Sequence, residues 1–375
     1  MKKFSIAQRT VCVVVASLLL ASPMSALAQI KLGSVTGVTG AQAAGVADVI
    51  FAAKLVFDDV NSKGGINGQK IEWKIVDDKF DPAETKKLLP DLLADKNIVA
   101  LFTNRGTPNS QAAMPFLEAQ KIALLAPGTG AMLLHQPVNP YIFNVRPPYR
   151  NESEKAVVHA YETGATRVGI IASADTFGDD AVEGAQIALK RLNKKPVFVH
   201  RIDRTTPDVD AVIKAIRPEN PQRILFFGTG GSVAAIIKAM RKEGIQTKVT
   251  TLSNNASSGF IAALGPIGVG TVVMQVFPNE RDLSIPVIAE LTKLAEKAGK
   301  QEITPLMVDG FTSAKVMVAA LKNAKIPITR DSVRESLESL SVDVGGMKIE
   351  FSPSNHTGLR YSDISIIGAD ARFRR

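Results

Sequence analysis

Residues 30–78 read IKLGSVTGVTGAQAAGVADVIFAAKLVFDDVNSKGGINGQKIEWKIVDD, and the spacing of their apolar side chains changes twice along this stretch. The apolar run at 30–36 predicts a buried strand, and the alternation over 70–78 predicts a second one. Between them, 42–62 places apolar residues three or four positions apart, as on one face of a helix. These residues are Val46, Ile50, Ala53, Phe57 and Val60. A strand, a helix and a strand in this order indicate parallel strands joined by a crossover helix.

The glycine-rich segment NSKGGINGQ (61–69) lies between this helix and the second strand. A phosphate-binding loop needs the opposite order, in which a strand leads into glycines and then into the N-terminus of a helix. We therefore interpret the segment as a corner of the scaffold. Gly64 or Gly65 would end the helix in a left-handed conformation, and Asn67 with Gly68 would turn the chain into the strand.

The same alternation of short apolar strands and longer helical patterns continues almost to residue 280. Such alternation is typical of parallel sheets with helices on both faces. The segment RPPYRNE (146–152) separates two series of these units. The sequence therefore predicts an α/β fold of two doubly wound parallel-sheet lobes, between which the chain crosses more than once.

The first 28 residues have the features of a cleavable secretory signal. A basic start is followed by an apolar run of 13 residues, TVCVVVASLLLAS (10–22), and by the small-residue site ALA at 26–28. Cys12, the single cysteine, falls inside this signal, so the mature chain would have no disulfide and no thiolate ligand. We expect an exported chain that begins at Gln29, is located in a bacterial periplasm and has no membrane-spanning segment.

The basic charge of the chain does not indicate nucleic-acid binding. The formal charge of +9 includes Lys2, Lys3 and Arg9 of the signal, so the mature chain would carry +6. The remaining basic residues are scattered, whereas a nucleic-acid site would need a basic stripe with aromatic residues interleaved. A solvated basic surface is the favoured interpretation.

Catalytic and metal motifs are absent from the sequence: it contains no HExxH, CxxC or GxSxG. The doublets Asp77-Asp78 and Asp179-Asp180 could be metal carboxylates, but a strand end and a helix N-terminus explain them without a metal. FFGTGGSVAA (226–235) resembles a dinucleotide loop, yet Val233 stands where the last glycine belongs. We expect no enzyme activity, no metal and no cofactor.

Five loops that follow predicted strands are rich in glycine and hydroxyl side chains. Ligands of open parallel sheets bind beyond the carboxyl ends of the strands, and helix N-termini at those ends favour small anions. Each loop alone could be an ordinary turn, but five together on two lobes indicate a binding cleft without a nucleophile or base. The loops are 103–110, 126–131, 173–180, 228–232 and 253–258.

Taken together, several of these segments closely resemble the leucine/isoleucine/valine-type periplasmic binding proteins, the solute receptors of ABC importers. The resemblance lies in residues 30–40 and 52–85, in PGTGAMLLHQPVNPYIFNVRPPYRNE (127–152), in DTFGDDAVEGAQIAL (175–189) and in IEFSPSNHTGLRYSDISIIG (349–368). It implies the type I fold, with a three-segment hinge between the lobes. We expect 30–148 with 279–345 in one lobe, and 149–278 with 346–375 in the other.

The resemblance also implies the positions of ligand-binding residues. The family holds a ligand carboxylate with a hydroxyl of the first loop and with groups of the next, and Phe177 stands where the second lobe usually has tyrosine. Thr229 matches the loop after FF. The residues that correspond to the carboxylate-binding groups are Thr107, Gly128, Thr129 and Gly130.

One departure from the family concerns the ligand's amino group. Amino-acid binders place an acid for this ammonium where the present chain has Ser253, Asn254 and Asn255, and a buried ammonium without a charged partner is costly. Arg105 could face the cleft and pair a second anionic group, or it could be a solvated surface arginine. An aromatic or dicarboxylic acid is therefore favoured, with a branched-chain amino acid as the family default.

The main functional prediction is a monomeric periplasmic receptor, which closes on a small carboxylate and docks on an inner-membrane ABC permease. Two alternatives remain open at this point. One is an exported sensory receptor for a signalling partner, and the other is an exported enzyme on the same fold.

Overall fold

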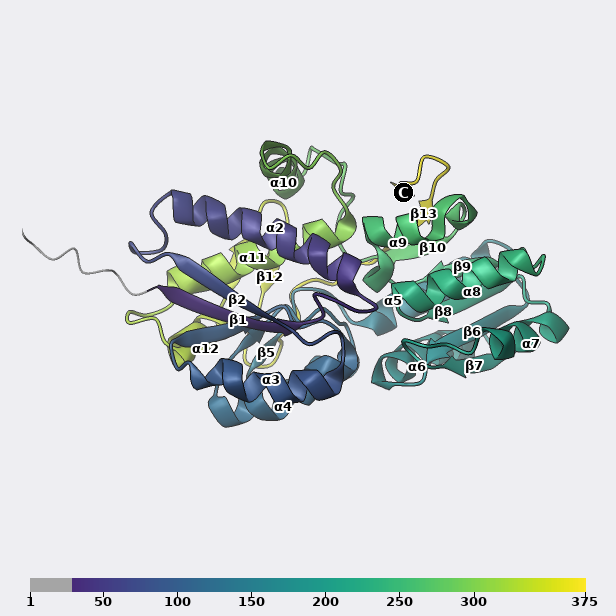
Figure 1. Ribbon diagram of the computed structural model, residues 1–375, viewed down its shortest axis with the longest axis horizontal. Coiled ribbons are helices and arrows are strands. Elements are labelled where there is room, and N and C mark those ends of the chain that lie inside the picture. The colour runs from purple at the N-terminus through teal and green to yellow at the C-terminus, as the bar shows by residue number, and fades with distance from the viewer. Residues whose placement is uncertain (1–28) are drawn as a thin grey trace, which may run out of the picture.

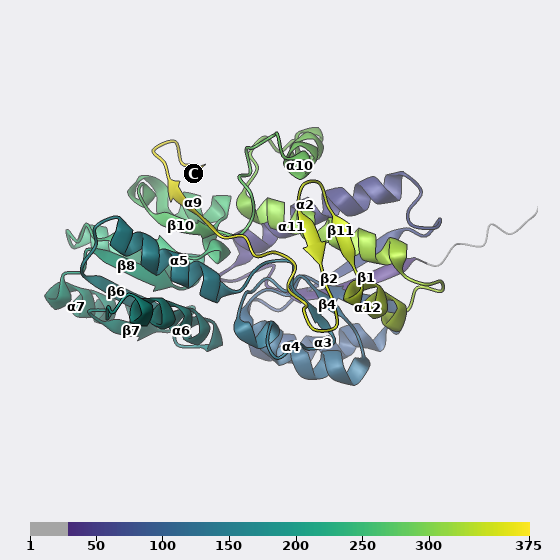
Figure 2. The same ribbon diagram turned by 180° about the vertical axis from the view of Figure 1, so that it is seen from behind.

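The computed structural model describes residues 29–375, which form two α/β lobes lying side by side (Figures 1 and 2). The predicted signal at 1–28 lies outside the described residues. Within the described part of the chain, no helix is both long and apolar enough to cross a bilayer.

The first lobe is built on a five-stranded sheet in the order β2-β1-β3-β4-β5, in which all strands are parallel. Its strands are β1 (Ile30–Thr36), β2 (Ile71–Asp77), β3 (Ile98–Phe102), β4 (Leu124–Leu125) and β5 (Ile142–Phe143). Its helices are α2 (Ala43–Ser62), α3 (Pro82–Ala94), α4 (Thr107–Gln120), α10 (Pro286–Lys297), α11 (Pro305–Asn323) and α12 (Arg330–Glu338), with the short 3₁₀ helix η1 (Met132–Leu134) before β5. Helices α3 and α4 cover one face, and α2, α10, α11 and α12 cover the other.

The second lobe contains a seven-stranded sheet in the order β14-β13-β10-β9-β8-β6-β7. Its strands are β6 (Val168–Ser173), β7 (Val199–Ile202), β8 (Arg223–Phe227), β9 (Lys248–Thr251), β10 (Val272–Gln275), β13 (Asp363–Ile367) and β14 (Phe373–Arg374). Its helices are α5 (Tyr149–Glu162), α6 (Thr176–Arg191), α7 (Val209–Glu219), α8 (Gly230–Lys242) and α9 (Ser258–Leu264), with the 3₁₀ helices η2 (Ser253–Asn255) and η3 (Gly265–Gly268). Helices α5 and α6 cover one face, and α7, α8 and α9 cover the other. The predicted fold class is confirmed, although β13 and β14 add an antiparallel edge.

The chain crosses between the lobes three times. The first crossing follows Val145, the second follows Gln275, and the third runs from Leu359 to β13 (Figure 2). The predicted assignment of 346–375 to the second lobe is wrong for its first part. Strand β12 (Lys348–Glu350) pairs with β11 (Ser341–Asp343), and Ile349, Phe351 and Leu359 pack in the core of the first lobe. The strand-like pattern of this segment is real, but its partner is the preceding strand.

The corner predicted at 61–69 is confirmed. Gly64 and Gly65 have φ values of +99° and +78°, in the region that favours glycine. Asn67 and Gly68 follow with φ values of +50° and +80°, and Ile66 and Gln69 form an antiparallel bridge across the turn. The corner joins the C-terminus of α2 to the start of β2, at the end of the sheet remote from the carboxyl edges.

Candidate functional site

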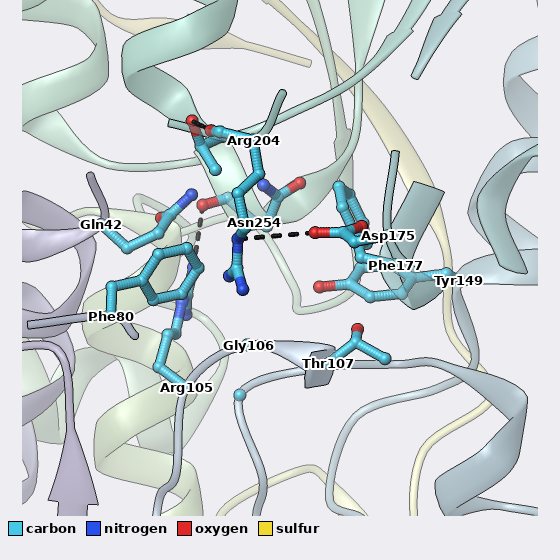
Figure 3. Close-up of a pocket in the computed structure, with 12 residues that line it drawn as sticks. Gln42, Phe80, Arg105, Gly106, Thr107, Tyr149, Asp175, Phe177, Arg204 and Asn254 are labelled. Atoms are coloured by element: carbon cyan, nitrogen blue, oxygen red, sulfur yellow. Dashed lines mark hydrogen bonds and ion pairs between the residues drawn. The ribbon is translucent and has the colours of Figure 1, made fainter. Parts of the chain in front are cut away.

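A small cavity lies between the lobes at the carboxyl ends of both sheets (Figure 3). Its empty space, counted together with the open solvent at its mouth, is about 310 Å³. Apart from Tyr149, the lining residues follow eight strands, four in each lobe, so closure of the lobes forms the cavity. Those of the first lobe are Gln42, Phe80, Arg105, Gly106, Thr107 and Gly128, and those beyond the first crossing are Tyr149, Asp175, Phe177, Arg204, Thr229 and Asn254.

The structure brings six of the nine predicted binding residues to this cavity: Arg105, Thr107, Gly128, Phe177, Thr229 and Asn254. The other three lie directly behind it. The Thr129 hydroxyl is hydrogen-bonded to the Thr107 hydroxyl at 2.6 Å. The Gly130 carbonyl accepts a bond of 2.6 Å from the Tyr149 backbone N–H, and the Ser253 N–H donates to Glu152 Oε2 at 2.8 Å. These three residues support the lining without forming it.

Arg105 is a buried residue, with 5 % of its surface exposed, and is not a solvated surface arginine. Its Nη2 donates a hydrogen bond of 2.8 Å to the backbone carbonyl of Asn254 in the other lobe (Figure 3). A glycine makes room for the side chain, because a Cβ on Gly128 would lie 2.8 Å from Arg105 Cδ. The guanidinium therefore lies at the lobe interface, in a space that the missing side chain of Gly128 leaves open.

The charge of Arg105 is not balanced by a direct partner. Among residues 29–375, its one hydrogen-bond acceptor is the Asn254 carbonyl, and no carboxylate forms an ion pair with it. Burial lowers the pKa of Arg105, because desolvation disfavours the charged form. A buried guanidinium with unused donors in a cavity is a binding group for a carboxylate.

Arg204 supplies a second guanidinium from the other lobe. It stacks on the Phe80 ring at 4.0 Å, and its Nε lies 3.4 Å from Asp175 Oδ2. Asp175 also caps α6, because its side chain accepts a bond of 3.0 Å from the Gly178 N–H. The Thr229 hydroxyl holds the Arg204 loop by donating to the Arg204 carbonyl at 3.0 Å. Arg204 is thus fixed at the mouth by contacts in both lobes.

The lining carries one positive charge in excess, since Arg105 and Arg204 are opposed by Asp175 alone. At 253–255 the cavity offers a neutral amide, and Asn254 Oδ1 has no hydrogen-bond partner within the described chain. The remaining walls are aromatic: Tyr149 and Phe177 meet edge to face with their rings 5.0 Å apart, and Phe80 lies opposite. This combination fits an anion with a flat or apolar body.

A buried ion pair positions the hinge beside the cavity. Arg146 in the first crossing is paired with Glu152 of α5, and both residues are almost completely buried. Glu152 in turn accepts from the Ser253 N–H, and the Arg146 guanidinium lies 4.3 Å from the Tyr149 ring. These contacts fix the loop at 253–255 relative to the crossing.

The two aspartate doublets that could hold a metal have other partners in the structure. Within residues 29–375, no group of three or more potential protein ligands is clustered. The Asp78 carboxylate accepts bonds from Thr85 Oγ1 at 2.5 Å and Asn109 Nδ2 at 3.0 Å, and Asp180 accepts from the Met132 N–H at 3.1 Å. Both doublets therefore have structural partners.

Six lining residues were not predicted from the sequence: Gln42, Phe80, Gly106, Tyr149, Asp175 and Arg204. All but Tyr149 follow the carboxyl ends of strands, and this rule could have found them. The side chains that turn inward depend on loop conformation, however. Phe80 reaches the cavity from two successive residues with positive φ, Lys79 and Phe80 itself.

Comparisons with known proteins agree with this geometry. The family described as periplasmic binding protein matches residues 29–366. A leucine-specific-binding protein of Salmonella typhimurium is 22 % identical over 246 residues, which are 65 % of this chain and 66 % of that protein. The chain thus matches about two thirds of the length of this relative.

Solved structures show the same fold. A substrate-binding periplasmic protein from Ralstonia solanacearum superposes with a TM-score of 0.85 at 26 % identity, over 92 % of this chain and 99 % of that one. A possible leucine/isoleucine/valine-binding protein from Rhodopirellula baltica superposes with a TM-score of 0.87 at 23 % identity, over 95 % and 98 % of the two chains. The resemblance noted in the sequence is confirmed.

Proposed function

The chain belongs to the family of periplasmic binding proteins, and from this we propose that it is the solute receptor of an ABC importer for a small carboxylic acid without an α-ammonium group. The family consists of solute-binding proteins, not enzymes, which agrees with the absence of catalytic motifs from the sequence. Its partners would be the ligand and an inner-membrane permease, and it would act in the periplasm as a monomer.

The buried guanidinium of Arg105 is the single observation that carries this proposal. It lines the cavity, retains unused donors and has no carboxylate partner within residues 29–375. A ligand carboxylate at this position would supply the missing charge through charge-assisted hydrogen bonds. Thr107 would add a hydroxyl donor beside it.

The absence of an acid at 253–255 argues against an α-amino acid. An ammonium placed there would meet the Asn254 amide, and Asp175 is already engaged by Arg204 and by the N-terminus of α6. The leucine-specific relative makes leucine the natural competitor. Transfer of its ammonium into this cavity would lack a charged partner.

Closure of the two lobes is the proposed binding mechanism. Arg105 of the first lobe bonds Asn254 of the second, and Arg204 of the second stacks on Phe80 of the first. A ligand that contacts both guanidinium groups would favour the closed state over the open one, because only closure brings them together. The closed form would then dock on the permease.

Thermal-shift screening tests the proposal. The signal-free protein is screened with the common amino acids and with aromatic and dicarboxylic acids, because a ligand raises the unfolding temperature as it binds the native state. We expect stabilisation by one of the acids. Stabilisation by leucine or valine with no response to any acid would contradict the proposal.

Substitution of Arg105 tests whether the acid found in the screen binds in this cavity. Arg105→Gln should weaken binding of the acid found in the screen by about tenfold to a hundredfold, since hydrogen bonds to a charged group contribute about 1.5–3 kcal/mol. Arg217→Gln is the matched control, because Arg217 is exposed and pairs with Glu243 on the outer surface. Equal affinities of the two variants would contradict the role of Arg105.

A further inference from the structure

The side-chain amide of Asn254 is a lining group that carboxylate binding by Arg105 does not use. Asn254 lies in η2 of the second lobe, has 7 % of its surface exposed and lines the ligand cavity (Figure 3). Its side-chain oxygen, Oδ1, is buried and has no hydrogen-bond partner within residues 29–375. Buried side-chain oxygens are in large majority hydrogen-bonded, so the missing donor needs an explanation.

The other end of the amide fixes its orientation. Asn254 Nδ2 donates to the Gly228 carbonyl at 3.0 Å and to Asn255 Oδ1 at 3.1 Å. A backbone carbonyl only accepts, so an exchange of the amide nitrogen and oxygen would place two oxygens against each other. Neither Gly228 nor Asn255 lines the ligand cavity. Oδ1 is therefore the end of the amide that is left for a donor from a ligand.

The backbone of Asn254 connects this acceptor to the carboxylate site. Arg105 Nη2 donates to the Asn254 carbonyl at 2.8 Å, so a carboxylate on the remaining donors of Arg105 would lie beside Asn254. The same hydrogen bond joins the two lobes, and its loss on opening would uncover both residues to an entering ligand. A ligand donor for Oδ1 is thus expected on the carbon next to the carboxylate.

Gln42 adds a second neutral amide, from the first lobe. It is the N-cap residue of α2, yet its side chain makes no capping hydrogen bond, and it lines the cavity. Its Oε1 and Arg105 Nη2 lie 3.6 Å and 3.5 Å from the position that a Cβ on Gly45 would occupy, so the amide lies close to the guanidinium. Both lobes thus place a neutral amide near Arg105, which suits an uncharged polar group of the ligand.

The charges of the lining favour a hydroxyl over an ammonium as this group. One positive charge is in excess, and a monoanion balances it. Asp175 is engaged by Arg204 and by the Gly178 N–H. An ammonium beside Asn254 would therefore have a neutral acceptor and the like charge of Arg105 nearby. A hydroxyl carries no charge, and a single acceptor satisfies its one donor.

We propose that the ligand is a 2-hydroxy carboxylic acid, whose carboxylate binds Arg105 and whose hydroxyl donates to Asn254 Oδ1. The inference rests on the proposed function, which places the carboxylate at Arg105, and it makes Asn254 the residue that selects the 2-substituent. A hydrogen atom at this position would leave Oδ1 without a donor, and an ammonium would lack a charged partner. Sites built to bind a hydroxyl discriminate strongly against analogues that lack it.

Two sets of matched ligands test the selection. One set is propanoate, lactate and alanine, and the other is 4-methylpentanoate, 2-hydroxy-4-methylpentanoate and leucine, with the enantiomers measured separately. Calorimetric titration into the signal-free protein gives the ratio of affinities within each set, in which the contribution of the shared carbon chain cancels. We expect the hydroxy acid of at least one set to bind about tenfold more tightly than the unsubstituted acid and the amino acid.

Asn254→Ala removes the acceptor and should reduce the ratio between hydroxy acid and unsubstituted acid at least threefold. Ser257→Ala is the matched control in the same loop. Ser257 is buried and caps α9 by accepting from the Phe260 N–H at 3.1 Å, but it does not line the cavity. This variant should keep the wild-type ratio even if its affinities for both acids fall. Thermal unfolding without ligand establishes whether each variant is folded.

The outcomes separate the selection from the carboxylate site. A wild-type ratio of one or less in both sets, with binding of an unsubstituted acid, would overturn the selection whether or not the variants fold, and would leave the carboxylate site intact. So would binding of an acid from the wider screen with no response to either hydroxy acid. An unchanged ratio in folded Asn254→Ala would overturn the role of Asn254. If no acid of either set or of the screen bound, the proposed function would fail together with the selection.

Discussion

At the scale of single residues, the cavity depends on one buried charge, that of Arg105, for which the described chain provides no carboxylate partner. Arg105 lacks a carboxylate partner, while Arg146 nearby is fully paired with Glu152. Arg105 is therefore available to bind a ligand, whereas Arg146 stabilises the hinge. This difference also explains why two arginines of similar burial should respond differently to ligand binding.

His135 gives a prediction on pH dependence. Its ring is buried, its Nδ1 lies 2.7 Å from the Thr357 hydroxyl, and burial together with the Arg146 charge lowers its pKa from 6.5 to about 3. Between these values the unfolded chain binds a proton that the folded chain does not. The free energy of unfolding should therefore fall as the pH falls below 6.5, by up to about 1.4 kcal/mol per pH unit from this group.

Urea unfolding of wild-type protein and His135→Gln at pH 7.5, 6 and 5 measures this contribution. The variant lacks the pH-dependent contribution of His135. Its free energy of unfolding, relative to that of wild-type protein, should therefore rise as the pH falls. A difference that stays constant from pH 7.5 to 5 would contradict the account.

At the scale of secondary structure, α2 packs closely against α11 in the core of the first lobe. Gly310 permits this contact, since a Cβ added there would overlap the backbone of Val49 and lie 2.8 Å from its Cα. Gly310→Ala should reduce the free energy of unfolding by about 1–3 kcal/mol, the usual cost of overpacking. Chemical denaturation measures the effect.

Gly231→Ala is the matched control for Gly310→Ala. Gly231 lies in the first turn of α8, and a Cβ there meets no atom within 4 Å. Alanine in a helix is intrinsically better than glycine by up to about 1 kcal/mol, so this variant should be as stable as wild type or more stable. Equal destabilisation of both variants would rule out the packing explanation.

Strands, helices and the loops of the cavity could be predicted from the sequence because they depend on local patterns. The loops at 103–110 and 126–131 were found from the rule that ligands bind at the carboxyl ends of strands. Arg204 and Phe80 were not found, because their inward orientation depends on a contact between the two lobes. The assignment of 346–375 failed for a similar reason: the partner of β12 is a short neighbouring strand, which no periodicity reveals.

At the scale of the whole molecule, function depends on the distance between the two lobes. Helix α9 of the second lobe approaches α2 of the first at Gly259, where an added Cβ would overlap Ala44 Cβ. Gly259→Leu should hold the lobes apart and weaken ligand binding at least tenfold. Ala263→Leu is the control on the same helix, since Ala263 is exposed.

Small-angle X-ray scattering with and without saturating ligand measures this closure. Wild-type protein and Ala263→Leu should contract when the ligand is added, and Gly259→Leu should contract less. Full contraction and wild-type affinity of Gly259→Leu would show that closure does not need the contact between α2 and α9.

The most direct test of the central claim compares two ligands that differ only in the α-amino group. L-leucine and 4-methylpentanoate share the same carboxylate and the same carbon chain, and both are titrated calorimetrically into the signal-free protein at pH 7.5. Because the cavity offers Arg105 for the carboxylate and no free acid for an ammonium, 4-methylpentanoate should bind at least tenfold more tightly than leucine. Tighter binding of leucine would contradict the account.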